Sequence, residues 1–540
     1  MFNSLTEKNI LSNYLSLSFA CLGGICMGLT TAPVQAFFLA WVAFIPLWLL
    51  IFNRAEISYK KVFFLGIAWG CGYHGLGLFW ITGIHPMTWM GVPWLASLLI
   101  AIFCWVFITL WGAILVATWS VLMRFFQTKI SYREGRNYFI VSFSRIVVGT
   151  ALWCGLEALW SRGDLWWTSL SFTQSPHNLL VLQLSHFSGP ATVTAAIVVI
   201  NGLIAEGILS QNSKIKSSQK NPLHNFIQNT KQNIQRLFLF FIALLLLVTF
   251  HLVGWKMYSQ PLADLPEKAI KVGLIQGNIP NTIKLNSVGL GKAIQGYTQG
   301  YQKLATQGVD GVLLPETALP FVWDNRGNFY REILRQGIPA WVGAFGKQDS
   351  SYTNSLFSIT GNGELISRYD KAKLVPLGEY IPFESILGKV IDRLSPLDAH
   401  LTRGKPEQVF QTPFGQAIVG ICYESAFPEV FRRQAQGGGE FILSSSNDAH
   451  YSEVMPRQHH AQDIMRAIET ERWTVRATNT GYSAIVDPRG NTEWISKLNQ
   501  YQIHSHVIYG RSEKNLYVRW GDWLTWVLLV ISGLIMLFVR

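Results

Sequence analysis

The sequence of 540 residues is poor in charged residues and in cysteine. Asp, Glu, Lys and Arg together make up 14% of it, whereas 49% of its residues are hydrophobic and 21 are tryptophan. This composition excludes a single soluble domain, because so little charge cannot cover the apolar surface of so long a chain. One large stretch of the sequence, between Met257 and Asp522, contains no long apolar run. The sequence therefore indicates a membrane protein that carries a sizeable soluble part.

Eight apolar runs are long enough to cross roughly 30 Å of hydrocarbon. The first of them has few basic residues ahead of it and lacks a small-x-small cleavage site, so we expect a retained helix and not a signal peptide. We expect a membrane domain of seven transmembrane helices over residues 1–256, a soluble domain over 268–512 and a C-terminal transmembrane helix over 523–540. The runs are Leu11–Leu29, Val34–Phe52, Val62–Ile84, Val92–Met123, Phe139–Trp160, Ala191–Leu209, Leu237–Trp255 and Trp523–Val539.

The loops between these runs differ in their content of basic residues. Thr30–Pro33 and His85–Gly91 contain no Lys or Arg, and Ser161–Pro190 contains only Arg162. The alternate loops are basic, which predicts that they lie in the cytoplasm and that the soluble domain lies outside it. The net charge of +12 partly reflects this pattern, so it does not imply a nucleic-acid partner. The basic residues are Arg54, Lys60, Lys61, Arg124, Lys129, Arg133, Arg136, Lys214, Lys216, Lys220, Lys231 and Arg236.

Of the six cysteines, only Cys422 lies in the polar segment. Cysteines outside the cytoplasm are usually paired, so a lone one is either a buried filler or a reactive thiol. Cys422 follows the strand-like run Ala417–Ile421, and the end of a strand is where a sheet presents a side chain to a cleft. This position favours a chemical role.

The soluble segment alternates between strand-like and helix-like patterns, which predicts a layered α/β or α+β domain with its own core. We expect helices over Gly289–Gln307 and from Pro456 to about Arg476, and turns at Gly361–Gly363 and Pro488–Gly490. The expected strands are Ile270–Gln276, Gly311–Leu314, Trp341–Phe345, Ser355–Thr360, Glu364–Tyr369, Ala417–Ile421, Phe441–Ser445 and Ser483–Val486.

Two charged residues that stand at or just after strand-like runs complement the thiol chemically. Glu316 is suited to take the proton of Cys422, and Lys371 is suited to stabilise the oxyanion of a tetrahedral intermediate. The backbone N–H of Tyr423 is a candidate second donor. Their spacing leaves open whether these groups meet, because a single Glu or Lys is usually a solvated surface group.

The motifs around these residues resemble a known family. Leu314-Pro315-Glu316, Tyr369-x-Lys371 and Ile421-Cys422-Tyr423-Glu424 resemble the three catalytic signatures of the nitrilase superfamily, whose triad is Glu, Lys and Cys. With seven spans before this domain and one after it, the chain resembles the membrane-embedded branch, the apolipoprotein N-acyltransferases. The resemblance also covers Val272–Pro280, Leu374–Glu379, Ser446–Ala449 and Asn479–Gly481.

The resemblance implies an α-β-β-α sandwich seated on a helical membrane domain of the bacterial cytoplasmic (inner) membrane, on its outer side. It implies that Cys422 attacks the sn-1 ester of a phospholipid such as phosphatidylethanolamine and forms a thioester. The acyl chain then passes to the α-amino group of the S-diacylglyceryl cysteine of an apolipoprotein. Glu379 resembles a carboxylate that orients Lys371, and Tyr423 and Glu424 resemble residues that shape the site. For these three residues, a purely structural role in hydrogen bonding is about as well supported. No cofactor is implied.

The chain departs from some relatives at two places. They carry a Trp where this chain has Lys284-Leu285, and an aromatic residue after Asn-Asp-Ala where this chain has His450. His450, His459 and His460 suggest a metal site at first sight, but no further ligands follow at zinc-type spacing, so we expect no metal.

Several tryptophans lie near the expected outer ends of the spans, where indole rings anchor proteins at the membrane boundary. An alternative is a vestibule in which Trp166-Trp167 and the following Leu170, Phe172, Leu179 and Leu180 hold a lipid tail. Glu157 is an ionisable group at membrane depth, either functional or snorkelling to water. The other tryptophans of this set are Trp80, Trp89, Trp94, Trp153 and Trp160.

Two other functions compete with acyl transfer. A membrane-anchored amidase would use the same triad with water as acceptor, although a single span would suffice to anchor it. A transporter would need paired polar residues at mid-membrane depth, and Arg145, Glu157 and Glu206 are too few and too near the span ends.

Overall fold

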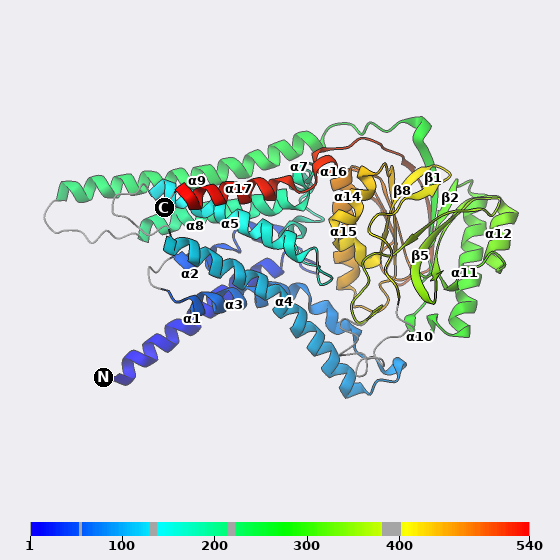
Figure 1. Cartoon of the computed structure of the whole chain (residues 1–540), viewed down its shortest axis with the longest axis horizontal. Coiled ribbons are helices and arrows are strands. Elements are labelled where there is room, and N and C mark those ends of the chain that lie inside the picture. The colour runs from blue at the N-terminus through cyan, green and yellow to red at the C-terminus, as the bar shows by residue number, and fades with distance from the viewer. Residues whose placement is uncertain (1, 53–56, 130–137, 213–221, 381–400, 539–540) are drawn as a thin grey trace.

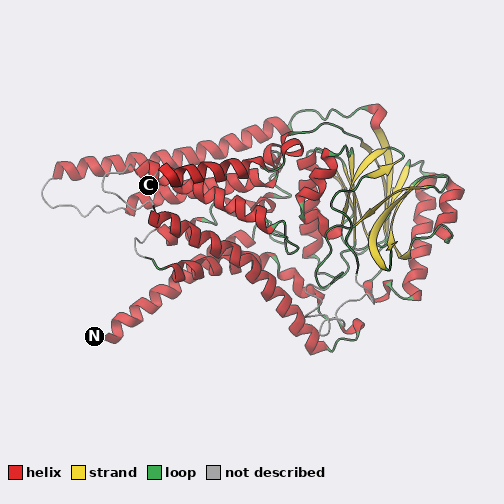
Figure 2. Cartoon of the chain, viewed as in Figure 1, coloured by secondary structure: helices red, strands yellow, loops and turns green. Residues whose placement is uncertain are grey.

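The computed structural model describes residues 2–52, 57–129, 138–212, 222–380 and 401–538. Helices fill one end of the molecule, and the strands are confined to the other end (Figure 2). The chain enters the helical part first, builds the sheets between residues 269 and 509, and returns to the helical part with its last helix.

The helical part is a membrane domain. Among the described helices, four are long and apolar enough to cross a membrane: Trp94–Thr128, Tyr138–Trp160, Pro190–Ser210 and Gln232–Tyr258. Each falls on an expected span. The helices of this part are α1 (Phe2–Gly28), α2 (Ile45–Phe52), α3 (Tyr59–Gly77), α4 (Trp94–Lys129), α5 (Tyr138–Trp160), α6 (Leu179–Leu182), α7 (Ser185–Ser188), α8 (Pro190–Asn212), α9 (Pro222–Tyr258) and α17 (Trp523–Phe538).

Two of the expected spans are broken. The run Val34–Phe52 divides into a 3-10 helix, η1 (Phe37–Trp41), and the eight-residue α2. The third run forms α3 only as far as Gly77, and a second 3-10 helix, η2 (Phe79–Ile84), follows it. The last expected span is unbroken, because α17 runs from Trp523 to Phe538, the last described residue, and it packs against α5 and α8. Hydropathy locates both interrupted runs, but it does not reveal where the helix is interrupted.

Small residues bring α3 and α4 into close contact. A Cβ atom added to Gly66 would lie 2.5 Å from the Cα of Ala117, and one added to Gly70 would lie 2.5 Å from the Cα of Ala113. Such small-xxx-small faces let helix backbones approach each other in a membrane, where dispersion contacts replace the hydrophobic effect. The position of α4 is therefore set by this glycine face.

The sheet part is a sandwich of two sheets. The first runs in the order β13-β1-β2-β4-β5-β6, with β3 beside β4, and the second runs β12-β11-β10-β9-β8-β7. Leu274 and Leu313 of the first sheet share one core with Val419 and Val475 of the second, so the sheets pack face to face. The strands are β1 (Ala269–Gln276), β2 (Gly311–Leu313), β3 (Leu319–Val322), β4 (Ala340–Gln348), β5 (Ser351–Ile359), β6 (Leu365–Asp370), β7 (Phe410–Thr412), β8 (Gly415–Ile421), β9 (Phe441–Ser446), β10 (Thr474–Thr478), β11 (Ala484–Val486), β12 (Thr492–Ile495) and β13 (Gln502–Tyr509).

Helices cover both outer faces of the sandwich, as expected for an α-β-β-α arrangement. α11 (Ser287–Thr306) and α12 (Asn328–Gln336) lie on the side away from the membrane domain, and α14 (Pro428–Gln436) and α15 (Val454–Thr470) lie on the side toward it (Figure 1). Residues of α15 such as Met465 and Ile468 belong to the same buried cluster as the core of the membrane domain. The two parts therefore share a continuous apolar core. Two short helices, α10 (Asn281–Lys284) and α16 (Leu516–Trp520), complete this part.

The expected helix from Pro456 to Arg476 is wrong in its last part. α15 ends at Thr470, Glu471 adopts a left-handed conformation with φ 56°, and Thr474–Thr478 forms β10. This strand lies in the middle of the second sheet, parallel to β9 and antiparallel to β11. The β-branched residues Thr474 and Val475 favour a strand, and pairing on both sides outweighs the helical pattern that precedes them.

Candidate active site

Cys422 lies at a sharp turn between β8 and the 3-10 helix η7 (Cys422–Ala426). Its φ of 52° is in the left-handed region, which a non-glycine residue adopts only where the surrounding structure holds it there. The side chain is buried, and the backbone N–H of Asn447 donates a hydrogen bond to the sulfur. The turn thus places a buried thiol directly after the end of β8, as the sequence pattern predicted.

Glu316 and Lys371 meet beside this thiol. The Lys371 Nζ atom lies 2.9 Å from Glu316 Oε1 and 2.9 Å from Glu379 Oε2, with the lysine 1% exposed. The side-chain amide of Asn354 donates to Glu316 at 2.6 Å and to Glu379 at 2.8 Å. The structure therefore brings together Glu316, Lys371 and Glu379 from three separate motifs. Asn354 is a residue that the sequence did not single out, because a polar residue inside a strand gives no signal by itself.

The neighbouring charges in this cluster shift the pKa values of Glu316 and Lys371 in the direction opposite to the effect of burial. Burial alone would raise the pKa of Glu316, but the Lys371 ammonium group outweighs it and holds the pKa below its usual value. Burial alone would lower the pKa of Lys371, and Glu316 and Glu379 raise it well above its usual value instead. For Cys422, burial and the Glu316 charge raise the pKa well above the ordinary value of a thiol, although Lys371 opposes them. In the resting site the carboxyl is ionised and the thiol is protonated.

Lys284 supplies a second buried cation. It lies at the end of α10, and its Nζ donates to the backbone carbonyl of Glu316 at 3.2 Å and to Thr317 Oγ1 at 2.7 Å. Burial lowers its pKa to about 8, against the opposing charges of Glu316 and Cys422. The sequence pointed to this position only as a departure from relatives, and nothing in it revealed that the side chain turns toward Glu316.

Glu424 and Tyr423 support the nucleophile turn in different ways. Glu424 accepts hydrogen bonds from the backbone N–H groups of Ile421, Ala372 and Lys373 at 2.8, 2.7 and 3.2 Å, and burial raises its pKa to about 7. It therefore ties the Cys422 turn to the loop after Lys371. The Tyr423 hydroxyl donates to the Asp164 carbonyl at 2.6 Å, so this side chain holds the turn against the membrane domain.

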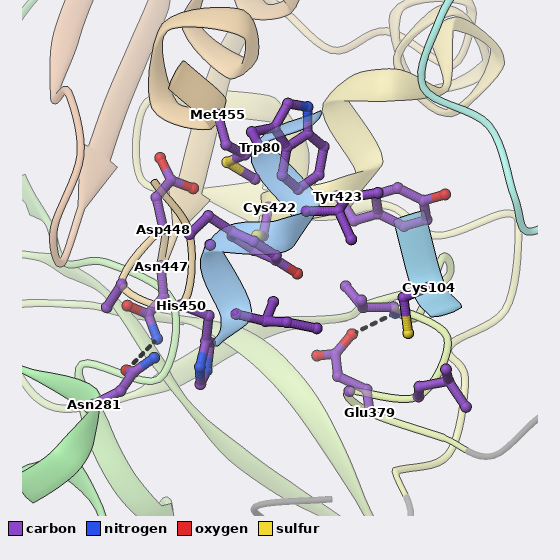
Figure 3. Close-up of a pocket in the computed structure, with 18 of the residues that line it drawn as sticks. Trp80, Cys104, Asn281, Glu379, Cys422, Tyr423, Asn447, Asp448, His450 and Met455 are labelled. Carbon is purple, nitrogen blue, oxygen red and sulfur yellow. Dashed lines mark hydrogen bonds between the residues drawn. The ribbon is translucent and has the colours of Figure 1, made fainter. Parts of the chain in front are cut away.

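A cavity of about 1200 Å³ connects this cluster to the membrane domain. Figure 3 shows Cys422 facing it, with Tyr423 and Cys104 of α4 on one side and Asn447 and His450 on the other. Its membrane wall contains apolar side chains of α4, including Phe103, Phe107 and Trp111. The cavity thus has an apolar wall on the membrane side and charged side chains beside Cys422.

The tryptophans of the sequence analysis divide into three groups. Trp80, Trp89, Trp160, Trp166 and Trp167 line the cavity, which fits the vestibule better than simple anchoring for these five. Trp153 is buried in the helix bundle, and Trp94 is 58% exposed. Leu170 and Phe172 were expected in the vestibule too, but they are buried among the bundle helices, outside the cavity wall that the described residues form. Leu179 and Leu180 are partly buried and also lie outside that wall.

Glu157 does not snorkel to water. It is 8% exposed and accepts hydrogen bonds from Trp153 Nε1, the Leu170 N–H, Ser169 Oγ and Thr194 Oγ1 at 2.8–3.0 Å. These bonds hold the start of the segment that follows Trp166 and Trp167. A second buried carboxylate, Glu206, pairs with Arg145 at 3.3 Å and accepts from Trp48 and Ser142, and it lies away from the cavity.

The three histidines have separate environments. His450 lines the cavity with its ring stacked on Trp89 at 6.0 Å, and burial lowers its pKa to about 4. His459 faces Asp448 and the carbonyl of Cys422, and His460 faces Thr492. Within the described residues, Cys422, Asp448 and His459 place their donor atoms within 4.8 Å of one another, as a metal site would. Both nitrogens of His459 are already hydrogen bonded, so this grouping does not present the open ligands that a metal needs.

Comparison with known proteins covers both parts of the chain. The family model described as apolipoprotein N-acyltransferase N-terminal domain matches residues 23–203, and the carbon-nitrogen hydrolase model matches residues 271–501. A protein of Nostoc sp. named apolipoprotein N-acyltransferase is 55% identical over 94% of this chain and 96% of its own length. A protein of the same name from Synechocystis sp. is 49% identical over 95% and 98%. Among solved structures, an amidase from Nesterenkonia sp. matches with a TM-score of 0.36 and 17% identity, over 48% of this chain and 95% of the amidase.

Proposed function

The chain belongs to the apolipoprotein N-acyltransferase family, and we propose that it moves an acyl chain from a membrane phospholipid, through a thioester on Cys422, to the N-terminus of lipoproteins. The acceptor is the α-amino group of the S-diacylglyceryl cysteine, and the donor is a phospholipid such as phosphatidylethanolamine. One observation carries the proposal: Glu316, Lys371 and Cys422 line a single cavity whose opposite wall is made by membrane helices. A lipid tail and a reacting ester can occupy such a cavity together.

The first half of the reaction forms the thioester. Glu316 takes the proton of the Cys422 thiol while the sulfur attacks the ester carbonyl, and Lys371 with the Tyr423 N–H stabilises the oxyanion. The C–O bond then breaks, and Glu316 returns the proton to the departing lysophospholipid oxygen. The ionised Glu316 and the protonated thiol of the resting site supply the base and the proton that this step needs.

The second half transfers the acyl chain. The acceptor amine attacks the thioester carbonyl, the new C–N bond forms, and the amine loses a proton to Glu316. The C–S bond then breaks, and Glu316 reprotonates the sulfur. Glu379 and Asn354 keep the Lys371 ammonium group and the Glu316 carboxylate in place through both halves. The eight-span topology, with the site at the outer leaflet of the cytoplasmic membrane, belongs to this proposal, because both lipid substrates lie there.

The test is mass spectrometry of the purified protein after incubation with a phospholipid that carries a labelled sn-1 chain. We expect the label as a thioester on the peptide that contains Cys422, and its transfer to a diacylglyceryl lipopeptide added next. Release of labelled free fatty acid with no transfer would identify a membrane-anchored amidase. Absence of a thioester would contradict both functions.

A further inference from the structure

A loop of the membrane domain carries an acidic side chain that the proposed reaction does not use. Asp164 lies between α5 and the 3-10 helix η4 (Leu170–Gln174), and two nitrogens of the Arg403 guanidinium group donate to its carboxylate at 3.0 and 2.8 Å. The Tyr380 hydroxyl donates to the same carboxylate at 2.7 Å. Burial alone would raise the pKa of Asp164, but the hydrogen bonds from Arg403 and Tyr380 hold it below its usual value. An ionised carboxylate therefore joins the membrane domain to two loops of the sandwich.

The backbone of the same loop is held by the sandwich as well. Lys373 Nζ donates to the backbone carbonyls of the two residues that precede Asp164, at 3.0 and 3.2 Å. The Tyr423 hydroxyl donates to the carbonyl of Asp164 at 2.6 Å and accepts from the N–H of Trp166 at 3.1 Å. Residues 162–166, called the 162–166 loop below, thus contact three separate segments of the sandwich.

Three of the side chains that hold the 162–166 loop are close neighbours, along the sequence, of groups at the reacting centre. They form the pairs Tyr423 and Cys422, Tyr380 and Glu379, and Lys373 and Lys371. Because only one or two residues separate the members of each pair, a shift of the loop would displace the reacting groups with it. Glu379 depends most on this support, since it lies in a loop outside the strands and yet holds the Lys371 ammonium group at 2.9 Å.

We propose that Asp164 is a positioning residue, which holds the segments of Lys371, Glu379 and Cys422 at the separation that acyl transfer needs. This inference rests on the proposed function. The Asp164 and Arg403 side chains are 32% and 40% exposed, and an exposed ion pair by itself adds little to stability. A displacement of about 1 Å at a reacting centre, in contrast, costs on the order of 100-fold in rate. The effect of Asp164 is therefore on the rate and not on unfolding.

A kinetic test uses Asp164→Ala in the full-length protein, with Glu440→Ala as the matched control. Glu440 forms a partly exposed ion pair with Lys268 at 2.9 Å, in the sandwich but outside the cavity wall that the described residues form. Asp164→Ala should lower the maximal rate of thioester formation at least about tenfold and leave the KM for the phospholipid within about twofold of the parent. Its midpoint of thermal unfolding should equal that of Glu440→Ala. A parental maximal rate in Asp164→Ala, or the same loss in Glu440→Ala, would overturn the proposal.

The same contact can be removed from the sandwich side, which keeps the test decisive if Asp164→Ala does not fold. Arg403→Met should lower the maximal rate in the same way, whereas Lys268→Met, at a side chain that is 44% exposed, should not. The double variant Asp164→Ala/Arg403→Met should lose no more than the more severe single variant, because both substitutions break one contact. Losses that multiply in the double variant would contradict a shared role.

Hydrogen–deuterium exchange separates this inference from the proposed function. The amides of residues 372–380 and 422–424 should exchange faster in Asp164→Ala than in the parent or in Glu440→Ala, because these segments lose their support from the membrane domain. Unchanged exchange in both segments would contradict the positioning role. If the parent formed no thioester, the proposed function would fail, and the exchange rates would still decide whether Asp164 positions the Cys422 turn.

Discussion

At the scale of single residues, the site keeps its proton on sulfur until the substrate arrives. The pKa of Glu316 is lowered by Lys371 against the effect of burial, and the pKa of Cys422 is raised by burial and by the Glu316 charge. A preformed thiolate is therefore not the resting state. In the proposed reaction, attack requires proton transfer to Glu316 in the transition state, and this requirement decides which substitutions should be severe.

Replacing the nucleophile should abolish the reaction. Cys422→Ala should form no acyl-enzyme and give no turnover, and Cys422→Ser should keep at most a trace, because a hydroxyl is far harder to deprotonate by the same base. Thioester formation with labelled phospholipid and lipopeptide acylation measure the two steps. Lipopeptide acylation by the Ala variant near the parental rate would exclude Cys422 as the nucleophile.

Replacing the base or the oxyanion partner should slow thioester formation without unfolding the protein. Glu316→Gln and Lys371→Met should each lower the rate by roughly 100-fold or more, the usual loss for a general base or an oxyanion donor. Glu364→Gln and Lys347→Met, at exposed positions of the same domain, are matched controls that should remain near the parental rate. A parental rate in either site variant would show that its assigned role is wrong.

Lys284 should make the rate depend on pH. Its pKa is lowered to about 8 by burial, so its ammonium group is charged below that pH and becomes neutral above it. The charge favours an ionised Glu316 and the developing thiolate, so the parent should exceed Lys284→Met below about pH 8, and the ratio of the two rates should fall toward one above it. Lys284→Arg, which stays charged, should keep the advantage at high pH. A ratio that does not change with pH would exclude this electrostatic role.

At the scale of elements, the pairing of α3 with α4 shapes the membrane side of the cavity. The contact depends on Gly66 and Gly70, which admit the backbone of α4 at Ala117 and Ala113. The same helix α4 supplies Phe103, Phe107 and Trp111 to the cavity wall. The separation of the two helices therefore bears on both the stability of the fold and the shape of the cavity.

A single methyl group at this contact should be destabilising. Gly70→Ala places a Cβ atom 2.5 Å from the Cα of Ala113, where only movement of the helices can relieve the clash. We expect a loss of about 1–3 kcal/mol, the usual cost of overpacking, and a lower midpoint of thermal unfolding. Gly533→Ala in α17 is the matched control, because a Cβ there meets nothing within 4 Å. Equal midpoints for the two variants would show that the contact tolerates expansion.

At the scale of the whole molecule, the proposed mechanism requires the sandwich to face the outer leaflet. The basic loops predict this orientation, and α9 leads directly from the membrane domain to β1. A reporter fused after the exposed Gln260 should behave as extracytoplasmic, and one placed between α8 and α9 should behave as cytoplasmic. A cytoplasmic signal from the first fusion would separate Cys422 from its lipoprotein substrate and overturn the function together with the topology.

The sequence by itself determined which segments are apolar, where most strands begin and which motifs flank Glu316, Lys371 and Cys422. These features are local, because hydropathy and strand alternation are carried by neighbouring residues. The same local information failed at Thr474–Thr478, where pairing with β9 and β11 converts the end of an expected helix into a central strand. It also failed at the second span, where the expected single helix Val34–Phe52 divides into η1 and α2.

Only the tertiary structure decided which polar side chains meet. Lys284 and Glu316 are 32 residues apart, and Cys422 and His459 are 37 residues apart. The protonation states of Lys284, Glu316 and Cys422 follow from burial and from partners that the chain brings in from other elements, such as Asn354 and Asp448. The sequence motifs identify the candidate reacting groups, but packing between distant segments sets the charges and hydrogen bonds around them. Such interactions depend on distance in space and not on separation along the chain.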